Sequence, residues 1–306
     1  MTPRLIGVDW GTTSLRCYLV DGTGVILARQ SSDQGILSVP PGEFGNVLAN
    51  HTQAWRSAHP GLPIVLSGMI GSRQGWHEIA YVRCPARLAD LADAIHRIDY
   101  PSLPAVMLVP GLDTRNKDDV PDVMRGEETQ IFGAMMQRNL TDGTFVLPGT
   151  HSKWAHVHDG AITAFATYMT GEVFAALCGH TILGRLMTGS DSCHDGVSFL
   201  RGVCASTGEG GPGALLNHIF SARTLGLFDM IPGNGVRSYL SGLLIGSEIR
   251  SGHKTSFGAS PIRIIGNPEL GSRYAEAARA LELDVEIVDG DCVAYGHLAL
   301  ADQAQL

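Results

Sequence analysis

The sequence predicts an α/β protein of two domains, each of which begins with the same strand–turn–strand unit. Short apolar runs typical of buried strands alternate along the chain with segments of helical hydrophobic spacing. The chain has 306 residues, which is long enough for two domains. Five residues of the first unit recur in the second unit at one constant offset in the numbering. Such an internal repeat is weighed before single motifs because it defines the whole fold.

The composition describes a globular chain with a large apolar core. Hydrophobic residues make up 44% of the chain and charged residues 17%, and no stretch approaches the ~20 uncharged apolar residues that a membrane span requires. The net charge of −8 argues against nucleic acid as a main partner. Six cysteines without C-x-x-C spacing predict reduced thiols, and the histidines lack zinc-ligand spacing. The N-terminus lacks a signal-peptide pattern, so we expect a cytoplasmic protein without membrane contact.

The first unit contains a candidate phosphate site. The apolar run at residues 5–8 predicts a buried strand that Asp9 ends, and the alternation over residues 14–20 predicts a second strand. The turn between them is made of small residues, namely Gly11, Thr12 and Thr13. Glycine lets backbone N–H groups approach an anion, threonine hydroxyls add donors, and a carboxylate can hold a cation beside a phosphate. An ordinary polar hairpin is the alternative.

The second unit repeats the first. Residues 144–147 predict a buried strand, and a polar turn follows with Gly149, Thr150, His151, Ser152 and Lys153. Gly11, Thr12, Ser14, Asp21 and Gly22 recur 138 positions later as Gly149, Thr150, Ser152, Asp159 and Gly160. Two such turns on opposite sides of a cleft can bind one polyphosphate, so the repeat predicts a nucleotide site. The acidic residue Asp9 is not repeated, because the equivalent position is Leu147.

A glycine-rich loop follows the predicted buried strand at residues 64–66. Its candidate ligand-binding residues are Ser67, Gly68, Met69, Arg73 and Trp76. Proteins of the α/β class place ligands in loops that follow buried strands. A long surface turn is the alternative, but arginine and tryptophan are unusual choices for a linker.

A second candidate ligand site lies at the start of a predicted helix. Ile131, Met135 and Arg138 fall on helical spacing, which places the sequence Arg125-Gly126-Glu127-Glu128 at the helix N-terminus. The two acids there are either part of a site or only complement the helix dipole.

Two glycine positions in the second half are candidates for nucleotide binding. Gly242 and Gly246 lie four apart in an apolar helix, where they make a flat surface for a planar group or for another helix. A buried strand at residues 262–265 ends in Gly266 and Asn267 before a helix at residues 272–281. This strand–turn–helix arrangement is typical of a nucleotide pocket.

The G-x-G-x-x-G pattern at residues 208–213 does not predict a dinucleotide site. No strand precedes it, and Pro212 with helical segments on both sides indicates a turn between helices.

The remaining elements are predicted from periodicity and breaking residues. Helices are expected at residues 40–59, 88–98, 173–177, 182–187, 197–204 and 291–301. Strands are expected at residues 106–109 and 285–288, and a charged loop is expected at residues 113–122.

Several strings spread over the whole chain resemble one family. They are LIGVDWGTTSLRCYLVD, SGMIGSRQGW, VPGL with MRGEETQIFGA, LPGTHSKW, TYMTGEVFAAL and IIGNPELGSRYAEA. These strings closely resemble the 2-dehydro-3-deoxygalactonokinase family, which belongs to the superfamily of sugar kinases, actin and heat-shock chaperone ATPases. The resemblance runs from the first strand to the last helix.

The resemblance implies an actin-like ATPase fold, in which two duplicated ribonuclease-H-like α/β domains flank a central ATP cleft. Residues 1–142 are then the substrate-binding domain with the first phosphate hairpin, and residues 143–290 are the nucleotide-binding domain. The last helix, within residues 291–306, is expected to pack back on the first domain.

The resemblance also implies a reaction. The γ-phosphoryl group of ATP moves to the terminal hydroxyl of 2-dehydro-3-deoxy-D-galactonate, giving the 6-phosphate in galactonate catabolism, with Mg²⁺ as the metal ion. Asp9 then contacts the magnesium ion, and Arg73 and Arg125 are the candidates for binding the substrate carboxylate, because an arginine fork matches a carboxylate. Related sugar kinases usually use an aspartate as general base. The corresponding stretch here holds Glu127 and Glu128, and the choice between these acids stays open.

Two other functions stay open. One is a kinase of the same superfamily that acts on another sugar or sugar acid. The other is an actin-like ATPase that binds protein, although such relatives carry large insertions for which 306 residues leave little room. The sequence also leaves open whether the chain forms a homo-oligomer.

Overall fold

A computed structural model describes residues 2–188, 194–206, 214–255 and 261–306 of the chain. The chain divides into two compact units. Unit 1 comprises Met1–Asp142, Ala155–Phe165 and Asp289–Leu306, and unit 2 comprises Gly143–Trp154 and Ala166–Val288. The G-x-G-x-x-G pattern at residues 208–213 lies outside the described residues.

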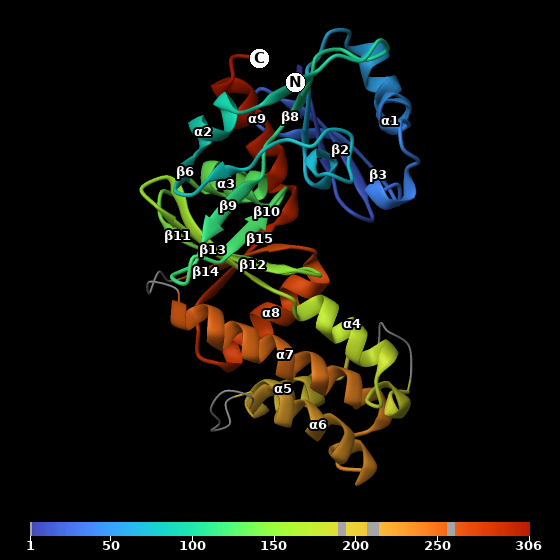
Figure 1. Cartoon of the computed structure of the whole chain (residues 1–306), viewed down its shortest axis with the longest axis vertical. Coiled ribbons are helices and arrows are strands. Elements are labelled where there is room, and N and C mark those ends of the chain that lie inside the picture. The colour runs from blue at the N-terminus through green and yellow to red at the C-terminus, as the bar shows by residue number, and fades with distance from the viewer. Residues whose placement is uncertain (1, 189–193, 207–213, 256–260) are drawn as a thin grey trace. The chain divides into compact units, whose positions relative to one another are not determined.

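The first sheet lies in unit 1 and has the strand order β3-β2-β1-β4-β8-β7. Its strands β2, β3 and β8 are labelled in Figure 1. Its strands are β1 (Pro3–Trp10), β2 (Leu15–Asp21), β3 (Ile26–Ser32), β4 (Ile64–Ser67), β7 (His96–Ile98) and β8 (Val106–Leu108). The first three strands form an antiparallel meander, and β4 pairs with β1 in parallel. In that parallel register Asp9 lies opposite Ser67, so two predicted site residues stand on neighbouring strands.

A further six-stranded sheet has the order β15-β14-β11-β12-β13-β6. Its strands are β6 (Ala86–Arg87), β11 (Gly143–Leu147), β12 (Ser152–His158), β13 (Ala161–Tyr168), β14 (Ile262–Gly266) and β15 (Val285–Asp289). The boundary between the units falls within β12 and β13. The succession β13-β12-β11-β14 matches β3-β2-β1-β4 of the first sheet, including the parallel pairing of β11 with β14. The repeat in the sequence is therefore a repeat in the fold.

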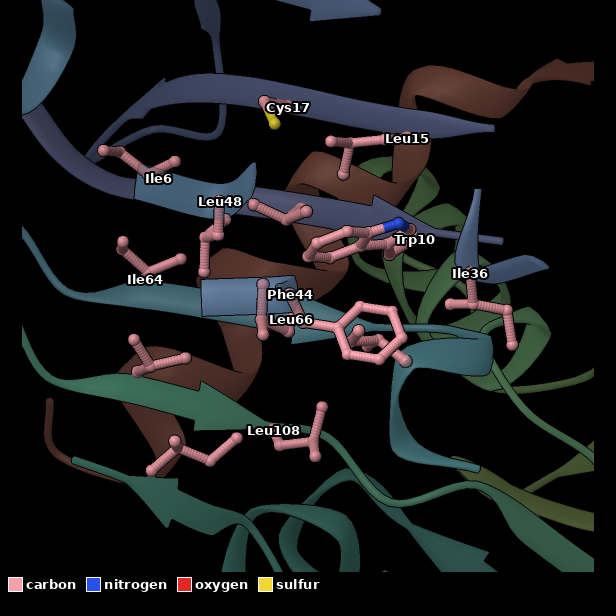
Figure 2. Packing of buried hydrophobic residues seen from close by; sticks show 14 of the residues in the cluster. Ile6, Trp10, Leu15, Cys17, Ile36, Phe44, Leu48, Ile64, Leu66 and Leu108 are labelled. Carbon is pink, nitrogen blue, oxygen red and sulfur yellow. The ribbon is translucent and has the colours of Figure 1, made fainter. Parts of the chain in front are cut away.

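The core of unit 1 is built from the inward faces of its sheet and from helix α1 (Phe44–Ala58) (Figure 2). Trp10 is fully buried, and its ring meets the Phe44 ring edge-on at a centroid distance of 5.7 Å. Its indole Nε1 donates a hydrogen bond of 2.8 Å to the Gln34 carbonyl, so the only polar atom of the ring is satisfied. Trp10 thus fixes the end of β1 directly after Asp9.

The other helices belong to the two units as follows. Unit 1 contains α2 (Leu88–Asp93), α3 (Glu127–Arg138) and α9 (Val293–Gln303). Unit 2 contains α4 (Thr170–His180), α5 (Gly196–Ala205), α6 (Ala214–Leu227), α7 (Gly233–Thr255) and α8 (Pro268–Ala280). Short 3₁₀ helices occur at Ile36–Ser38, Met69–Gly71, Gly184–Leu186 and Gly290–Cys292. Figure 1 shows α5 and α6 alongside the long helix α7, with which both are in contact.

Helix α9 packs on α3 within unit 1. Their backbones approach closely at two glycines, because a Cβ on Gly133 would lie 1.9 Å from the Cys292 carbonyl oxygen and one on Gly296 would lie 2.1 Å from that of Thr129. Among the described residues, none of the helices combines the length and the hydropathy that crossing a bilayer requires.

Two predicted helices are wrong. The helix expected at residues 88–98 ends at Asp93, and residues 96–98 instead form strand β7, which pairs antiparallel with β8 and buries Ile98. The helix expected at residues 182–187 is reduced to the 3₁₀ turn Gly184–Leu186, because the Thr181 hydroxyl binds the Leu183 N–H and turns the chain. Both errors arise where a pairing or a side-chain bond overrides helix propensity.

The charged loop expected at residues 113–122 is instead a hairpin. Strands β9 (Leu112–Arg115) and β10 (Pro121–Met124) pair antiparallel, and β5 (Val82–Arg83) pairs with β9. The Asn116 side chain accepts hydrogen bonds from the Asp118 and Val120 N–H groups, which closes the turn.

Candidate functional site

Three separate segments of unit 1 meet at Asp9, the penultimate residue of β1. A Cβ on Gly126 would lie 3.0 Å from the Gly68 Cα and 4.0 Å from Asp9 Oδ1. A Cβ on Gly68 would lie 2.7 Å from the Trp10 carbonyl oxygen and 3.3 Å from Asp9 Oδ1. Both glycines have positive φ, +96° for Gly68 and +109° for Gly126, so the backbone and the crowding both require glycine. The structure thus brings the predicted metal ligand together with both predicted substrate segments.

Asp9 is a nearly buried carboxylate with one cationic neighbour. Its side chain is 9% exposed, and Arg16 Nη2 lies 3.5 Å from Asp9 Oδ2. Burial raises the pKa of Asp9, and the positive charge of Arg16 opposes that rise. Sequence reasoning missed Arg16, although the hairpin register that pairs Asp9 with Arg16 follows directly from a short turn after Trp10.

The first phosphate turn is held by its own backbone and by the following loop. The Gly11 N–H donates to the Ser14 carbonyl at 2.9 Å, and the Ile36 N–H donates to the Gly11 carbonyl at 3.0 Å. Thr12 and Thr13 are exposed at the tip of the turn. The turn is therefore fixed in shape and presents its two threonines outward.

The predicted substrate loop after β4 divides into buried and exposed positions. Ser67 is fully buried and lies 2.9 Å from His297 Nε2 of α9. Burial lowers the pKa of His297 to about 3, so this imidazole is neutral. The Trp76 N–H donates to the Ile70 carbonyl, and the Trp76 ring meets the Tyr100 ring edge-on at 5.5 Å. Arg73 is exposed and Met69 is half-buried.

The two acids at the start of α3 are engaged with nearby backbone and hydroxyl groups. Glu127 Oε2 accepts a hydrogen bond of 2.9 Å from the Arg125 N–H, and Glu128 Oε2 accepts one of 2.7 Å from the Gly126 N–H. Glu128 is fully buried, and burial together with the charge of Glu127 raises the pKa of Glu128 to about 8. Both carboxyl groups thus bind backbone N–H groups of the two residues that precede α3, and neither caps the helix itself. Glu127 keeps partial exposure.

In unit 2 the second phosphate turn is anchored on a buried acid of α7. Glu248 Oε1 accepts hydrogen bonds from Ser152 Oγ at 2.6 Å and from Trp154 Nε1 at 2.8 Å, and Glu248 Oε2 accepts one from the Tyr274 hydroxyl at 2.6 Å. Burial raises the pKa of Glu248, and these hydrogen bonds, with one from Thr170, oppose the rise. Sequence reasoning missed Glu248, which belongs to no motif.

The start of α4 packs against the second phosphate turn. A Cβ on Gly171 would lie 2.4 Å from the Gly149 carbonyl oxygen, and the Glu172 N–H donates to the Thr150 carbonyl at 3.0 Å. The side chains of His151 and Glu172 form an exposed pair at 2.5 Å. This support was not predicted from the sequence.

The other predicted nucleotide residues of unit 2 differ in their surroundings. Lys153 is buried, and its Nζ donates to Thr167 Oγ1 at 2.7 Å. The Asn267 side chain caps α8 by accepting from the Glu269 N–H at 2.8 Å, and a Cβ on Gly266 would lie 3.7 Å from the Pro148 carbonyl oxygen. The Gly266–Asn267 turn therefore lies beside the second phosphate turn.

Gly242 lies against another helix. A Cβ at this position would lie 2.0 Å from the Phe199 carbonyl oxygen of α5. The surface left by this glycine is filled by α5, which is the helix-packing alternative for this position, and we leave Gly242 out of the site.

Comparison with known proteins finds relatives over nearly the whole chain. The family model described as 2-keto-3-deoxy-galactonokinase matches residues 9–300. A probable 2-dehydro-3-deoxygalactonokinase of Rhizobium meliloti (strain 1021) is 35% identical over 300 residues, which cover 97% of this chain and 96% of that protein. The 2-dehydro-3-deoxygalactonokinase of Escherichia coli (strain K12) is 34% identical over 292 residues, covering 95% of this chain and 94% of that protein.

Solved structures agree at the level of the fold. A crystal structure from Sinorhizobium meliloti, which provisionally carries the name 2-dehydro-3-deoxygalactonokinase, superimposes with a TM-score of 0.87 at 34% identity, covering 97% of this chain and 98% of that chain. Component A of the (R)-2-hydroxyglutaryl-CoA dehydratase of Acidaminococcus fermentans superimposes with a TM-score of 0.53 at 11% identity, covering 98% of each chain. The predicted actin-like fold with two ribonuclease-H-like domains is confirmed. The chain belongs to the 2-keto-3-deoxy-galactonokinase family.

Proposed function

We propose that this chain transfers the γ-phosphoryl group of ATP to the terminal hydroxyl of 2-dehydro-3-deoxy-D-galactonate, giving the 6-phosphate in cytoplasmic galactonate catabolism. The observation that carries the proposal is the whole-chain relationship, at 35% and 34% identity, to two proteins that bear the corresponding enzyme name. The duplicated turns and the cluster around Asp9 are consistent with phosphoryl transfer, in which a protein mainly positions groups and stabilises charge.

Each unit contributes one phosphate-binding turn to this proposal. In unit 1 the exposed Thr12 and Thr13 offer hydroxyl donors beside the backbone of Gly11. In unit 2, among the described residues other than the chain neighbours of Gly149, no atom lies within 4 Å of the place where a Gly149 side chain would stand. A phosphate can therefore approach that backbone closely. We propose that Thr150, His151, Ser152 and Lys153 give this second turn its shape and charge. Gly266 and Asn267 lie beside it.

The residues around Asp9 fit a magnesium ion. Mg²⁺ in phosphoryl-transfer enzymes is held by one or two carboxylates together with substrate phosphates and water, so a single carboxylate is a sufficient protein ligand. Asp9 supplies that carboxylate beside the backbone of Gly68 and Gly126, which carry no side chains. When bound, the ion neutralises charge on the transferring phosphoryl group. Arg16, at 3.5 Å from the carboxylate, favours its ionised form.

We propose that the sugar acid binds to the segments that meet Asp9. We assign its hydroxyl groups to the loop of Ser67, Gly68 and Met69, and its carboxylate to Arg73 or Arg125. Trp76 supports this loop through its contact with Tyr100. Glu127 and Glu128 are the candidate general bases, and we assign to one of them the removal of the proton from the attacking hydroxyl.

A coupled assay for ADP release tests the proposal. The purified protein is offered 2-dehydro-3-deoxygalactonate, other sugar acids and a neutral hexose, each with ATP and Mg²⁺, and the same reactions are repeated with excess EDTA. We expect turnover with the keto-deoxy acid and its loss with EDTA. Turnover with the hexose and none with the acid contradicts the proposal, and ATP hydrolysis that no sugar stimulates favours a protein-binding ATPase.

A further inference from the structure

Arg125 is a buried cation that forms no ion pair with an acid among the described residues. The residue is 7% exposed and stands two positions before the first residue of α3. Its Nη2 donates a hydrogen bond of 2.8 Å to the Ile79 carbonyl, and its guanidinium carbon lies 4.2 Å from the centre of the Tyr81 ring. Its Nε and Nη1 have no hydrogen-bond partner and almost no exposed surface. The guanidinium group thus has a neutral acceptor and an aromatic face, while two of its nitrogens have no acceptor.

The acids beside Arg125 in the sequence do not neutralise it. The Glu127 carboxylate accepts from the backbone N–H of Arg125, and the Glu128 carboxyl accepts from the Gly126 N–H and from Thr129 Oγ1. No ion pair within 4.0 Å joins the Arg125 side chain to an acid in the part of the chain that the structure describes. A buried charge without an opposite charge strongly destabilises a folded protein, so an anionic ligand is the natural partner of this group.

The position of Arg125 relates this anion to the candidate site. Its Nη1 lies 2.9 Å from the place where a Gly71 side chain would stand, so a larger residue there would press on the guanidinium group. The next residue, Gly126, is the one that lies against Gly68 and near Asp9. The guanidinium group therefore lies next to the predicted substrate loop, and the residue that follows Arg125 in the chain lies near the predicted metal ligand.

We propose that Arg125, and not Arg73, is the receptor for the carboxylate of the sugar acid, and that this subsite is covered until the acid binds. The inference rests on the proposed function, and it chooses between the two arginines that the sequence offers. Arg73 is exposed, and an exposed ion pair contributes little to binding because water screens it. A buried guanidinium group with unused N–H donors binds a carboxylate through charge-assisted hydrogen bonds that water does not weaken.

The cover is the loop of residues 71–79. The Ile79 N–H donates to the Gly71 carbonyl at 3.1 Å and closes the base of the loop, while the Ile79 carbonyl accepts from Arg125 Nη2. Because Nε and Nη1 are shielded, a carboxylate reaches them only after this base moves. The acid therefore displaces a contact of the cover, which also carries Arg73 and Trp76, and a neutral sugar does not.

Kinetics on matched variants tests the assignment. Arg125→Gln is compared with Arg73→Gln, which removes the same charge from the exposed position. The substrates are 2-dehydro-3-deoxygalactonate and its carboxamide, which keeps the hydroxyl groups but lacks the charge. In Arg125→Gln we expect the KM for the acid to rise on the order of 10²-fold, while the KM for ATP and for the carboxamide changes less than about threefold. In Arg73→Gln we expect the KM for the acid to change less than about threefold.

Binding of the acid without ATP, measured by isothermal titration, gives a readout that does not need turnover. Wild-type binding that Arg125→Gln abolishes supports the subsite even if no phosphorylation occurs, in which case the proposed function alone fails. Wild-type turnover with an unchanged KM for the acid in Arg125→Gln overturns the subsite and leaves the proposed function intact. An equal rise for acid and carboxamide also overturns it. If Arg125→Gln does not fold, Arg125→Lys replaces it, with an expected rise of about tenfold for the acid alone.

Amide hydrogen exchange tests the cover. The N–H groups of Gly75, Trp76 and Ile79 donate hydrogen bonds within the loop or to its base. We expect the acid to change their exchange rates in the wild type, and not in Arg125→Gln. Unchanged exchange at saturating acid in the wild type overturns the movement of the cover.

Discussion

Ser152 Oγ donates a hydrogen bond of 2.6 Å to the buried carboxylate of Glu248. Ser152 belongs to the second phosphate turn, and Glu248 belongs to α7, ninety-six residues further along the chain. In the first turn the equivalent residue, Ser14, closes the turn through its backbone carbonyl, which accepts from the Gly11 N–H. The two halves of the repeat thus have the same shape but different anchors.

This difference predicts the effect of Ser152→Ala. The substitution removes a side-chain hydrogen bond between the turn and Glu248, so we expect the KM for ATP to rise several-fold and the free energy of unfolding to fall by about 1.5–3 kcal/mol. Tyr274→Phe is the matched control, because it removes another hydrogen bond from the same carboxylate at 2.6 Å and keeps the bond from Ser152 to Glu248. Steady-state kinetics and thermal unfolding are measured on both variants. Equal changes in the KM for ATP would mean that Glu248 only stabilises the core.

Asp9→Asn is expected to lower kcat far more than it weakens substrate binding. The carboxylate acts on the transferring phosphoryl group, so its removal matters most in the transition state. We expect a loss on the order of 10²-fold or more in kcat. Arg16→Gln is a useful comparison, since it removes the cation 3.5 Å from Asp9 but keeps the carboxylate. Near-normal turnover of Asp9→Asn would assign the metal to another residue.

The neutral, buried His297 predicts a loss of stability in acid. Its pKa is about 3 in the folded protein and about 6.5 in the unfolded chain, so the unfolded state binds the extra proton between these values. The free energy of unfolding therefore falls as the pH drops below about 6.5, by up to about 1.4 kcal/mol per pH unit. His297→Gln keeps a donor for Ser67 and removes the titration. We therefore expect the free energy of unfolding, taken from denaturation curves, to fall less between pH 7 and pH 4 in this variant than in the wild type. An unchanged slope would assign the acid sensitivity to other groups.

The tight packing around His297 gives a related prediction for Gly7. A Cβ on Gly7 would lie 2.5 Å from His297 Nδ1, in the fully buried interface of β1 and α9. Gly7→Ala is therefore expected to destabilise the protein by about 1–3 kcal/mol through overpacking. Gly22→Ala, where nothing lies within 4 Å, is the control and should change the free energy of unfolding much less. Thermal unfolding of the two variants measures the difference.

The sequence predicted the parts of the fold that depend on local patterns and on the repeat. The strands that contain Asp9 and Ser67, and the strand that precedes Gly149, are all present, because short apolar runs between glycine-rich turns indicate buried strands. The meeting of Asp9, Gly68 and Gly126 was not predictable, since it depends on the parallel register of β1 and β4 and on the position of α3.

The residues that sequence reasoning missed act across long distances in the chain. Glu248 reaches Ser152 over 96 positions and His297 reaches Ser67 over 230, and neither stands in a motif. Single acids and histidines in helices carry no local signal, so only the tertiary structure identifies their partners. Arg16 is different, because the register of the first hairpin places it opposite Asp9.

The two acids at the start of α3 are expected to behave differently. Burial raises the pKa of Glu128 to about 8, so at pH 7 its carboxyl group is mostly protonated and resembles the amide of glutamine. Glu128→Gln should therefore keep kcat within about threefold at pH 7, while Glu127→Gln, at the partly exposed position, should lower kcat by roughly 10²–10⁴-fold if it is the general base. Steady-state kinetics at saturating acid and ATP compares the two variants.

The stability of Glu128→Gln checks the physical basis of this difference. The folded state keeps the Glu128 proton between about pH 4.5 and about pH 8, where the unfolded chain has released it, so the free energy of unfolding falls as the pH rises through this range. One such proton contributes up to about 1.4 kcal/mol per pH unit. Glu128→Gln should remove this slope and be more stable than the wild type at pH 8. A wild-type slope that survives the substitution would mean that Glu128 is ionised in the folded protein, which would return it to the list of candidate bases. Full activity in both glutamine variants would leave this stretch of the chain without a general base.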